Sequence, residues 1–183
     1  FLIDGRRLTN INHYYNKKVS ELKSKYAKNK SITDITTPRM MRLMNGRNNR
    51  ITDYFNRVCH LLVNTCFSYG VSTIVIGYNK GQKQEINLGK VNNQNIVSIP
   101  YHKFRQKLET ICTEYGIKYV SQEESYTSKA SAIDEDIIPV YGENTDNIVF
   151  SGKRIHRGLY RSSEGLYLNA YINGSINILR KYF

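Results

Sequence analysis

Two carboxylates, several hydroxyls and an amine lie close together in the sequence QEESYTSKAS at positions 122–131. The residues suited to chemistry in this segment are Glu123, Glu124, Thr127, Ser128 and Lys129. Carboxylate oxygens are the hard ligands that Mg²⁺ prefers, and hydroxyl and ammonium groups can hold a phosphate. Two Mg²⁺ ions held about 3.5–4 Å apart by converging carboxylates hydrolyse phosphodiesters. The segment therefore indicates one corner of a phosphodiesterase site, and the alternative is that the two glutamates are only a solvated strand end.

An alternation of strands and helices would position this segment. Apolar spacings of three and four predict helices, and short apolar runs such as STIVIGY and IKYVSQE predict strands. The expected elements are a strand at 1–6, a helical insertion at 8–70, a strand–helix–strand unit at 72–124, an irregular insertion at 125–168 and a C-terminal helix at 170–182. In the second helix of the helical insertion, Leu61 is expected on the buried face and Gly70 at the end. A polar loop is expected after Tyr78, and strands joined by turns are expected from 148 onward. This order predicts an α/β fold.

The two apolar strands should pair in parallel, because the helix at 101–115 between them is long enough for a crossover. Functional groups gather at the carboxyl ends of the strands in such sheets. The pattern therefore predicts that Gly77 and Glu124 share one edge of the sheet, with position 171 of the last helix close to them.

The charge of the chain favours a polyanionic partner. Lys and Arg number 27 against 15 Asp and Glu, a net charge of +12. The chain has two basic stripes: a helical one with Arg39, Arg42, Arg47 and Arg50, and a turn with Lys153, Arg154, Arg157 and Arg161. DNA or RNA would bind such stripes through its phosphates, and the alternative for each stripe is a solvated face. An anionic membrane surface is disfavoured because the apolar faces of the helices are expected in a core.

The cysteines and the hydropathy indicate a reducing compartment. Cys59, Cys66 and Cys112 have no CxxC spacing, which favours buried free thiols over a zinc site. No apolar run reaches the length of a membrane span. These features predict a cytoplasmic protein, associated with the nucleoid in a prokaryote, and leave its oligomeric state open.

Several segments resemble the TnpB/OrfB family of transposon-encoded, RNA-guided DNA nucleases. They are IVIGYNKGQKQEINLGKVNNQN, EESYTSKAS, FSGKRIHRGLYRS and LNAYINGSINILRK, with LIDGRRLTNINHYYNKK near the start. The resemblance runs in the same order over nearly the whole chain. It implies a single partial domain over 1–183: an RNase H-like (RuvC-like) α/β domain with a long helical hairpin insertion, whose first strands would precede this chain. It also implies DNA and guide RNA as partners and Mg²⁺ as the ancestral cofactor.

The family resemblance also assigns the metal ligands, which are three acidic residues. The first, an Asp, is expected on a strand before this chain, and Asp4 only imitates its motif. The second is commonly a Glu at the position of Gly77. One branch of the family moves this Glu to the place that Glu124 occupies, so Glu124 is the expected metal ligand and catalytic residue. The third, an Asp, is replaced by Tyr171, and a phenol with a pKa near 10 is a poor Mg²⁺ ligand.

The family's Cys-based zinc motif is also missing, because the chain has Ser131 and Ala132 at this point and no Cys. The acidic residues of the loop DED at 134–136 are expected to be solvated, as is Glu123.

One secure carboxylate of three cannot hold two metals. The sequence therefore predicts a nucleic-acid-binding RuvC-like domain that binds no Mg²⁺ and does not cut DNA on its own. Two alternatives remain. One is an active Mg²⁺-dependent DNA endonuclease completed by an upstream segment, and the other is a nuclease-dead DNA-binding repressor.

Overall fold

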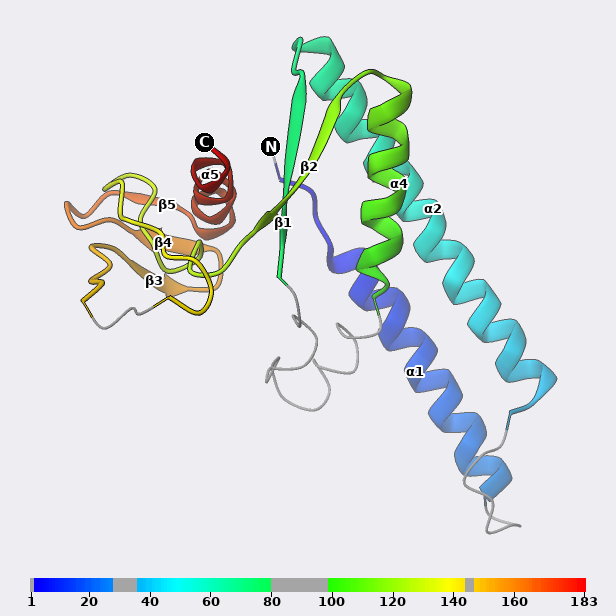
Figure 1. The fold of residues 1–183 in the computed structure, drawn as a ribbon. Coiled ribbons are helices and arrows are strands. Elements are labelled where there is room, and N and C mark those ends of the chain that lie inside the picture. The colour runs from blue at the N-terminus through cyan, green and yellow to red at the C-terminus, as the bar shows by residue number, and fades with distance from the viewer. Residues whose placement is uncertain (1, 28–35, 80–98, 144–146) are drawn as a thin grey trace. The chain divides into compact units, whose positions relative to one another are not determined.

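The computed structural model describes residues 2–27, 36–79, 99–143 and 147–183 (Figure 1). The chain divides into two compact units. The helical unit comprises Phe1–Val71 and Lys83–Gly116, and the strand unit comprises Ser72–Gln82 and Ile117–Phe183. The expectation of one partial domain over the whole chain stays a prediction. The polar loop expected after Tyr78 lies almost wholly outside the described residues.

The described part of the helical unit has three helices: α1 (Arg6–Ala27), α2 (Pro38–Ser68) and α4 (Tyr101–Glu114). Both α1 and α4 pack against α2. Helix α2 begins at Thr37, whose side chain accepts a hydrogen bond from the amide of Met40 at 3.2 Å. It ends before Gly70, whose φ of +67° is the left-handed conformation that closes helices, as the sequence predicts.

Apolar side chains form the core of the helical unit. Leu8, Ile51, Phe55 and Ile99 are buried together, and the ring of Phe104 lies 5.4 Å from that of Phe55. Such a core is what the spacing of apolar residues along each helix predicts.

One position of α2 differs from the prediction. Leu61, expected on the buried face, is 53% exposed, whereas Cys59 and Val63 are completely buried. Each residue turns the helix by about 100°, so positions 55, 59 and 63 share one stripe and position 61 lies away from it. Leu61 was expected to be buried because it is apolar, and the exposure of position 61 was therefore not predicted.

The expected strand at 1–6 is wrong for the residues that can be described. Residues 2–4 form no strand, and α1 starts at Arg6. The carboxylate of Asp4 accepts hydrogen bonds from the amide and the guanidinium of Arg6, both at 2.9 Å. A carboxylate in this position satisfies an amide that has no partner in the first helical turn. Asp4 thus initiates a helix and does not follow a strand.

The strand unit contains the predicted parallel pair. Strands β1 (Thr73–Tyr78) and β2 (Lys118–Glu123) run in parallel, with Thr73 opposite Lys118 and Tyr78 opposite Glu123. The pairing expected between these two apolar runs is confirmed.

A second, antiparallel sheet belongs to the same unit. It has the order β3 (Lys153–His156), β4 (Leu159–Arg161) and β5 (Tyr167–Asn169). The turn between β3 and β4 contains Gly158, whose φ of +89° few other residues tolerate. These strands confirm the strands joined by turns that are expected near the end of the irregular insertion.

Helix α5 (Ala170–Tyr182) joins the two sheets, because it packs against β1 and β2 and also against β4 and β5. Its bounds match the predicted helix. Asn169 begins it by accepting a hydrogen bond from the amide of Tyr171 at 2.9 Å. The described chain is therefore a mixed α/β structure. Among its helices, none is long and apolar enough to cross a membrane.

Polar side chains fill much of the interior beside α5. Asn173 and Asn177 are completely buried. Asn177 donates hydrogen bonds to the carbonyls of Thr127 and Ala130 at 3.0 and 2.7 Å, and Asn173 donates to the same Ala130 carbonyl at 2.8 Å. These bonds hold the segment that follows β2 against the helix.

Candidate functional site

Glu124 lies directly over Gly77, at the carboxyl ends of β1 and β2. A Cβ added to Gly77 would overlap the Glu124 carboxylate and would lie 2.6 Å from the Cδ1 of Ile178. A side chain at position 77 and the present Glu124 would therefore compete for the same space. The expectation that these two positions share one edge of the sheet is confirmed, and the role of Glu124 as a metal ligand stays a prediction.

Glu123 is not the solvated residue that the sequence predicts. It forms an ion pair with Lys181, whose side chain is only 5% exposed. Lys181 also donates to the carbonyls of Ser125 and Pro139 at 3.2 and 2.9 Å. Burial alone would raise the pKa of Glu123, but the hydrogen bonds from Lys181 and Ser125 outweigh it and hold the pKa below its ordinary value. The carboxylates of Glu123 and Glu124 thus have different neighbours, and the ion pair of Glu123 reduces the repulsion expected between two adjacent carboxylates.

Tyr171 lies in the first turn of α5 among arginines. Its hydroxyl accepts a hydrogen bond from the Nε of Arg157 at 3.2 Å, and the guanidinium of Arg154 lies 5.6 Å from the ring centroid. The hydrogen bond from Arg157 lowers the pKa of the Tyr171 hydroxyl. The Glu124 carboxylate lies near the side chain of Ile178, which is seven residues further along α5 than Tyr171, and seven helical residues rise about 10 Å. The expectation that position 171 lies close to Glu124 stays a prediction.

These residues do not fit a centre with two metal ions. Within the described ranges, no group of three or more His, Cys, Asp or Glu residues is placed to hold a metal. The position expected for the third carboxylate carries a phenol beside two guanidinium groups, which repel a cation.

The hydroxyl segment after the glutamates is partly buried. Thr127, expected to contact a phosphate, is 4% exposed, and its hydroxyl donates to the carbonyl of Glu124 at 2.8 Å. It is therefore a structural residue of the turn. Ser128 and Lys129 are exposed, and the phosphate contacts expected for them stay a prediction. The ammonium of Lys129 lies 5.7 Å from the ring centroid of Tyr126.

The acidic loop is held by hydrogen bonds and is not simply solvated. The carboxylate of Asp134 accepts from the amide and the hydroxyl of Ser163 at 3.0 and 2.7 Å. The carboxylate of Asp136 accepts from the amide of Ser131 at 2.7 Å and from Ser151. The amide of Asp134 donates to the hydroxyl of Ser131, which is completely buried. Hydrogen bonds thus connect the loop to the segment before β3 and to the turn after β4, at the place where the family resemblance implies a zinc motif.

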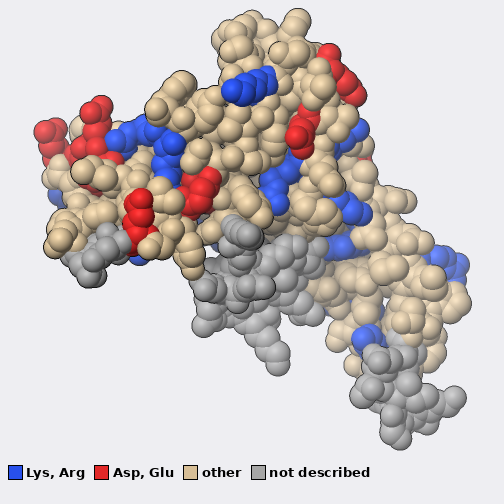
Figure 2. Space-filling view, in the orientation of Figure 1, with Lys and Arg blue, Asp and Glu red and all other residues tan. Residues whose placement is uncertain are grey.

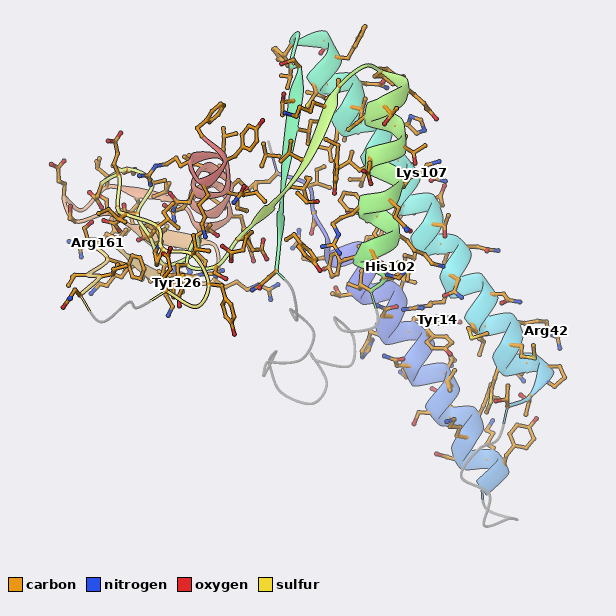
Figure 3. All side chains as sticks on the ribbon, viewed as in Figure 1. Tyr14, Arg42, His102, Lys107, Tyr126 and Arg161 are labelled. Carbon is orange, nitrogen blue, oxygen red and sulfur yellow. The ribbon has the colours of Figure 1, made fainter. Side chains whose placement is uncertain are left out.

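The basic turn of the strand unit is exposed. All four of its predicted contact residues lie at the surface: Lys153, Arg154, Arg157 and Arg161. Besides the Arg154–Tyr171 pair, the guanidinium of Arg161 lies 5.9 Å from the ring centroid of Tyr167. Figure 3 shows Arg161 and Tyr126 on this unit. Interleaved arginine and tyrosine can contact phosphates and bases together.

The helical stripe is exposed at three of its four predicted positions. Arg39, Arg42 and Arg50 lie at the surface of α2. On the face drawn in Figure 2, the charged side chains on the lower part of the helices are Lys and Arg. Arg47 is different, because it donates to the Oδ1 of Asn12 on α1 at 2.8 Å. Burial lowers its pKa, and it joins two helices.

The sequence analysis missed three residues whose hydrogen bonds hold the strand unit together: Lys181, Asn173 and Asn177. The spacing of the two asparagines was a usable signal, because residues four apart share one face of a helix. Lys181 gave no signal, since a lysine near a helix end is usually solvated.

Two family models match successive parts of the chain. A family described as a probable transposase (OrfB_IS605) matches residues 1–83, and the Cas12f1-like TNB domain matches residues 101–178. The TnpB-like protein ORF457 of Acidianus two-tailed virus is 25% identical over 185 residues. The chain is thus similar in sequence to a probable transposase family over its first part and to the Cas12f1-like TNB domain over its second. These matches agree with the resemblance to TnpB/OrfB proteins that the motifs carry, whereas the RuvC-like assignment and the branch with a relocated Glu stay predictions.

A solved structure shares the fold. It is the cryo-EM structure of a Cas12f1–sgRNA–target DNA complex, similar with a TM-score of 0.59 and 16% identity over 93% of this chain. The chain spans 42% of that Cas12f1 chain, and 98% of the chain aligns with 36% of the viral TnpB-like protein. It thus corresponds to less than half of each relative.

Proposed function

We propose that this chain is a nucleic-acid-binding part of a TnpB-type, transposon-associated nuclease, with a RuvC-like fold, and that it does not cut DNA by itself. The observation that carries the proposal is the exposed basic turn of the strand unit, where Arg154 and Arg157 surround Tyr171. The net charge of +12 favours any nucleic acid, and the aromatic ring adds a surface for bases. The related Cas12f1 was solved with RNA and DNA, which makes both the expected partners here.

The absence of cleavage follows from the same residues. Arg154 and Arg157 supply positive charge where the family resemblance implies a carboxylate ligand, and positive charge disfavours Mg²⁺. Glu124 alone offers a single carboxylate, whereas a centre with two Mg²⁺ ions needs several carboxylates that converge on the metals. We therefore propose that Mg²⁺ belongs to the ancestral site and does not bind to this chain.

A second candidate function, an active endonuclease completed by an upstream segment, is favoured by one observation. The Glu124 carboxylate occupies the space above Gly77, as expected for a ligand moved from position 77 to position 124. A strand that brought another carboxylate to this edge would give a partial metal site. Tyr171 would still have to be replaced by another ligand. A third candidate, a nuclease-dead DNA-binding repressor, would use the same basic surface as the first.

The test of binding is the salt dependence of affinity. Arg154→Gln with Arg157→Gln should reduce the slope of log affinity against log salt by roughly one to two units, if each arginine neutralises one phosphate. The measurement is fluorescence anisotropy with labelled DNA and RNA over a range of salt concentrations. Lys103→Gln with Lys107→Gln on α4 is the matched control, since it removes the same charge outside both stripes. Equal slopes for the two double variants would contradict the proposed interface.

A further inference from the structure

The cluster around Tyr171 has a fixed geometry. The amide of Tyr171 is held by Asn169 at the start of α5, at 2.9 Å. Arg154 from β3 lies over the ring, with its Cζ 5.6 Å from the centroid, and Arg157 from the following turn donates to the hydroxyl at 3.2 Å. Backbone, ring and hydroxyl are therefore each positioned by a separate contact. The ring is held in one orientation before any ligand arrives, which lowers the entropy cost of binding.

Tyr171 is nevertheless accessible. It is 47% exposed, and both arginines are at the surface. The cluster thus presents an aromatic ring together with two guanidinium groups to solvent. An aromatic ring stacks on a nucleobase, and guanidinium groups donate hydrogen bonds to phosphate oxygens.

We propose that Tyr171, Arg154 and Arg157 form a stacking site for one unpaired nucleotide of a single-stranded nucleic acid. The base stacks on Tyr171, and the flanking phosphates bind Arg154 and Arg157. A base inside a duplex has both faces covered by its neighbours, so it cannot present a face to the ring. The site therefore discriminates single strands from duplexes. This inference rests on the proposed nucleic-acid binding and adds which strand form is bound and by which residues.

The opposite end of α5 provides a matched control. Tyr182 also accepts a hydrogen bond from a cationic side chain, the Nζ of Lys118 at 3.2 Å, and this Nζ lies 5.8 Å from its ring centroid. It stands about 16 Å from Tyr171 along the helix axis. Its contacts involve one lysine, whereas Tyr171 contacts two arginines that can bind two phosphates. Tyr182→Leu thus removes a similar cation–aromatic contact from the same helix outside the proposed site.

The experiment compares the affinities of each variant for a labelled oligothymidine and for a duplex of the same length. Tyr171→Leu should lower the ratio of single-strand to duplex affinity on the order of tenfold, the usual effect of losing one stacked base. Tyr171→Phe keeps the ring and should retain the ratio within about twofold to threefold. Tyr182→Leu should leave the ratio unchanged. A 2-aminopurine in the single strand should lose fluorescence on binding to wild type and keep it with Tyr171→Leu.

The outcomes separate this inference from the proposed function. If wild type binds neither single strand nor duplex at low salt, nucleic-acid binding itself is wrong and the inference falls with it. If wild type binds but Tyr171→Leu and Tyr182→Leu give the same ratio, only the stacking site is wrong. Equal loss for Tyr171→Leu and Tyr171→Phe would also overturn it, because stacking survives in the second variant.

Discussion

The helical unit and the strand unit are held together by different kinds of contact. Apolar side chains such as Ile51 and Phe55 fill the core of the helical unit, with its arginines mostly outside. In the strand unit, buried Asn173, Asn177 and Lys181 bond to backbone carbonyls. Apolar packing tolerates small adjustments, whereas each buried polar group needs its own partner. The interior of the strand unit, which carries the candidate site, therefore tolerates fewer side-chain arrangements than the core of the helical unit.

The largest expected effect comes from placing a polar group in the helical core. Leu108 on α4 is completely buried, so Leu108→Asn should lower the free energy of unfolding by about 3–5 kcal/mol. Urea unfolding followed by hydrogen exchange should show faster exchange in α2 and α4. Leu61→Asn is the control, because Leu61 is exposed, and its effect should stay within about 0.5 kcal/mol. A larger loss for Leu61 than for Leu108 would refute the assignment of the core.

The reverse substitution should damage the strand unit. Asn177→Leu leaves the carbonyl of Thr127 without this donor and weakens the bonding of Ala130, at an expected cost of about 2–4 kcal/mol. Hydrogen exchange should accelerate in α5 and around residues 124–132. Ser175→Leu introduces the same side chain at an exposed position of the same helix and should cost less than about 0.5 kcal/mol. If Asn177→Leu were neutral, the polar interior would not be what stabilises this unit.

Two glycines of the strand unit should respond in opposite directions to alanine. At Gly77 the new Cβ would overlap Glu124 and Ile178, so Gly77→Ala should destabilise by about 1–3 kcal/mol. A Cβ added to Gly174 on α5 would have open space around it, and alanine should stabilise the helix by roughly 0.5–1 kcal/mol. Thermal unfolding of both variants is the measurement. A Gly77→Ala variant as stable as wild type would mean that Glu124 does not occupy this space.

The smallest expected effect is a dependence on pH. Because the pKa of Glu123 is lowered in the folded chain, its contribution to stability is present above the ordinary pKa of a glutamate and is lost as the pH falls through the lowered value. Glu123→Gln should therefore make the loss of stability in acid shallower. Exposed Glu109→Gln is the control and should leave the slope as in wild type. An unchanged slope for Glu123→Gln would show that the pair with Lys181 contributes nothing.

The sequence predicted the elements that depend on apolar periodicity. The parallel pair of β1 and β2, the end of α2 at Gly70 and the bounds of α5 were all visible, because each follows from spacing or from a glycine. The sequence-based predictions were wrong where one residue type is compatible with two structural roles. Asp4 was expected within a strand, but its carboxylate accepts a hydrogen bond from the amide of Arg6 at the start of α1. Thr127 was expected to contact a phosphate, but it is buried.

The candidate site was predicted in part. The proximity of Glu124 to Gly77 follows from the register of two parallel strands, which a sequence can suggest. The arginines around Tyr171 come from β3 and the following turn, and their meeting with α5 depends on tertiary packing. The spacing of residues in the sequence therefore does not predict the contact between these arginines and Tyr171. The pairing of Glu123 with Lys181, 58 positions apart, was hidden for the same reason.

The central claim is that this chain holds a nucleic-acid strand without cutting it. The most direct test incubates a labelled single-stranded DNA with the chain and Mg²⁺, then divides the sample between a native and a denaturing gel. The account predicts a shifted complex on the native gel and full-length strand on the denaturing gel. Cleavage products that require Mg²⁺ and disappear with Glu124→Ala would contradict the claim and would show that Glu124 serves a working metal site.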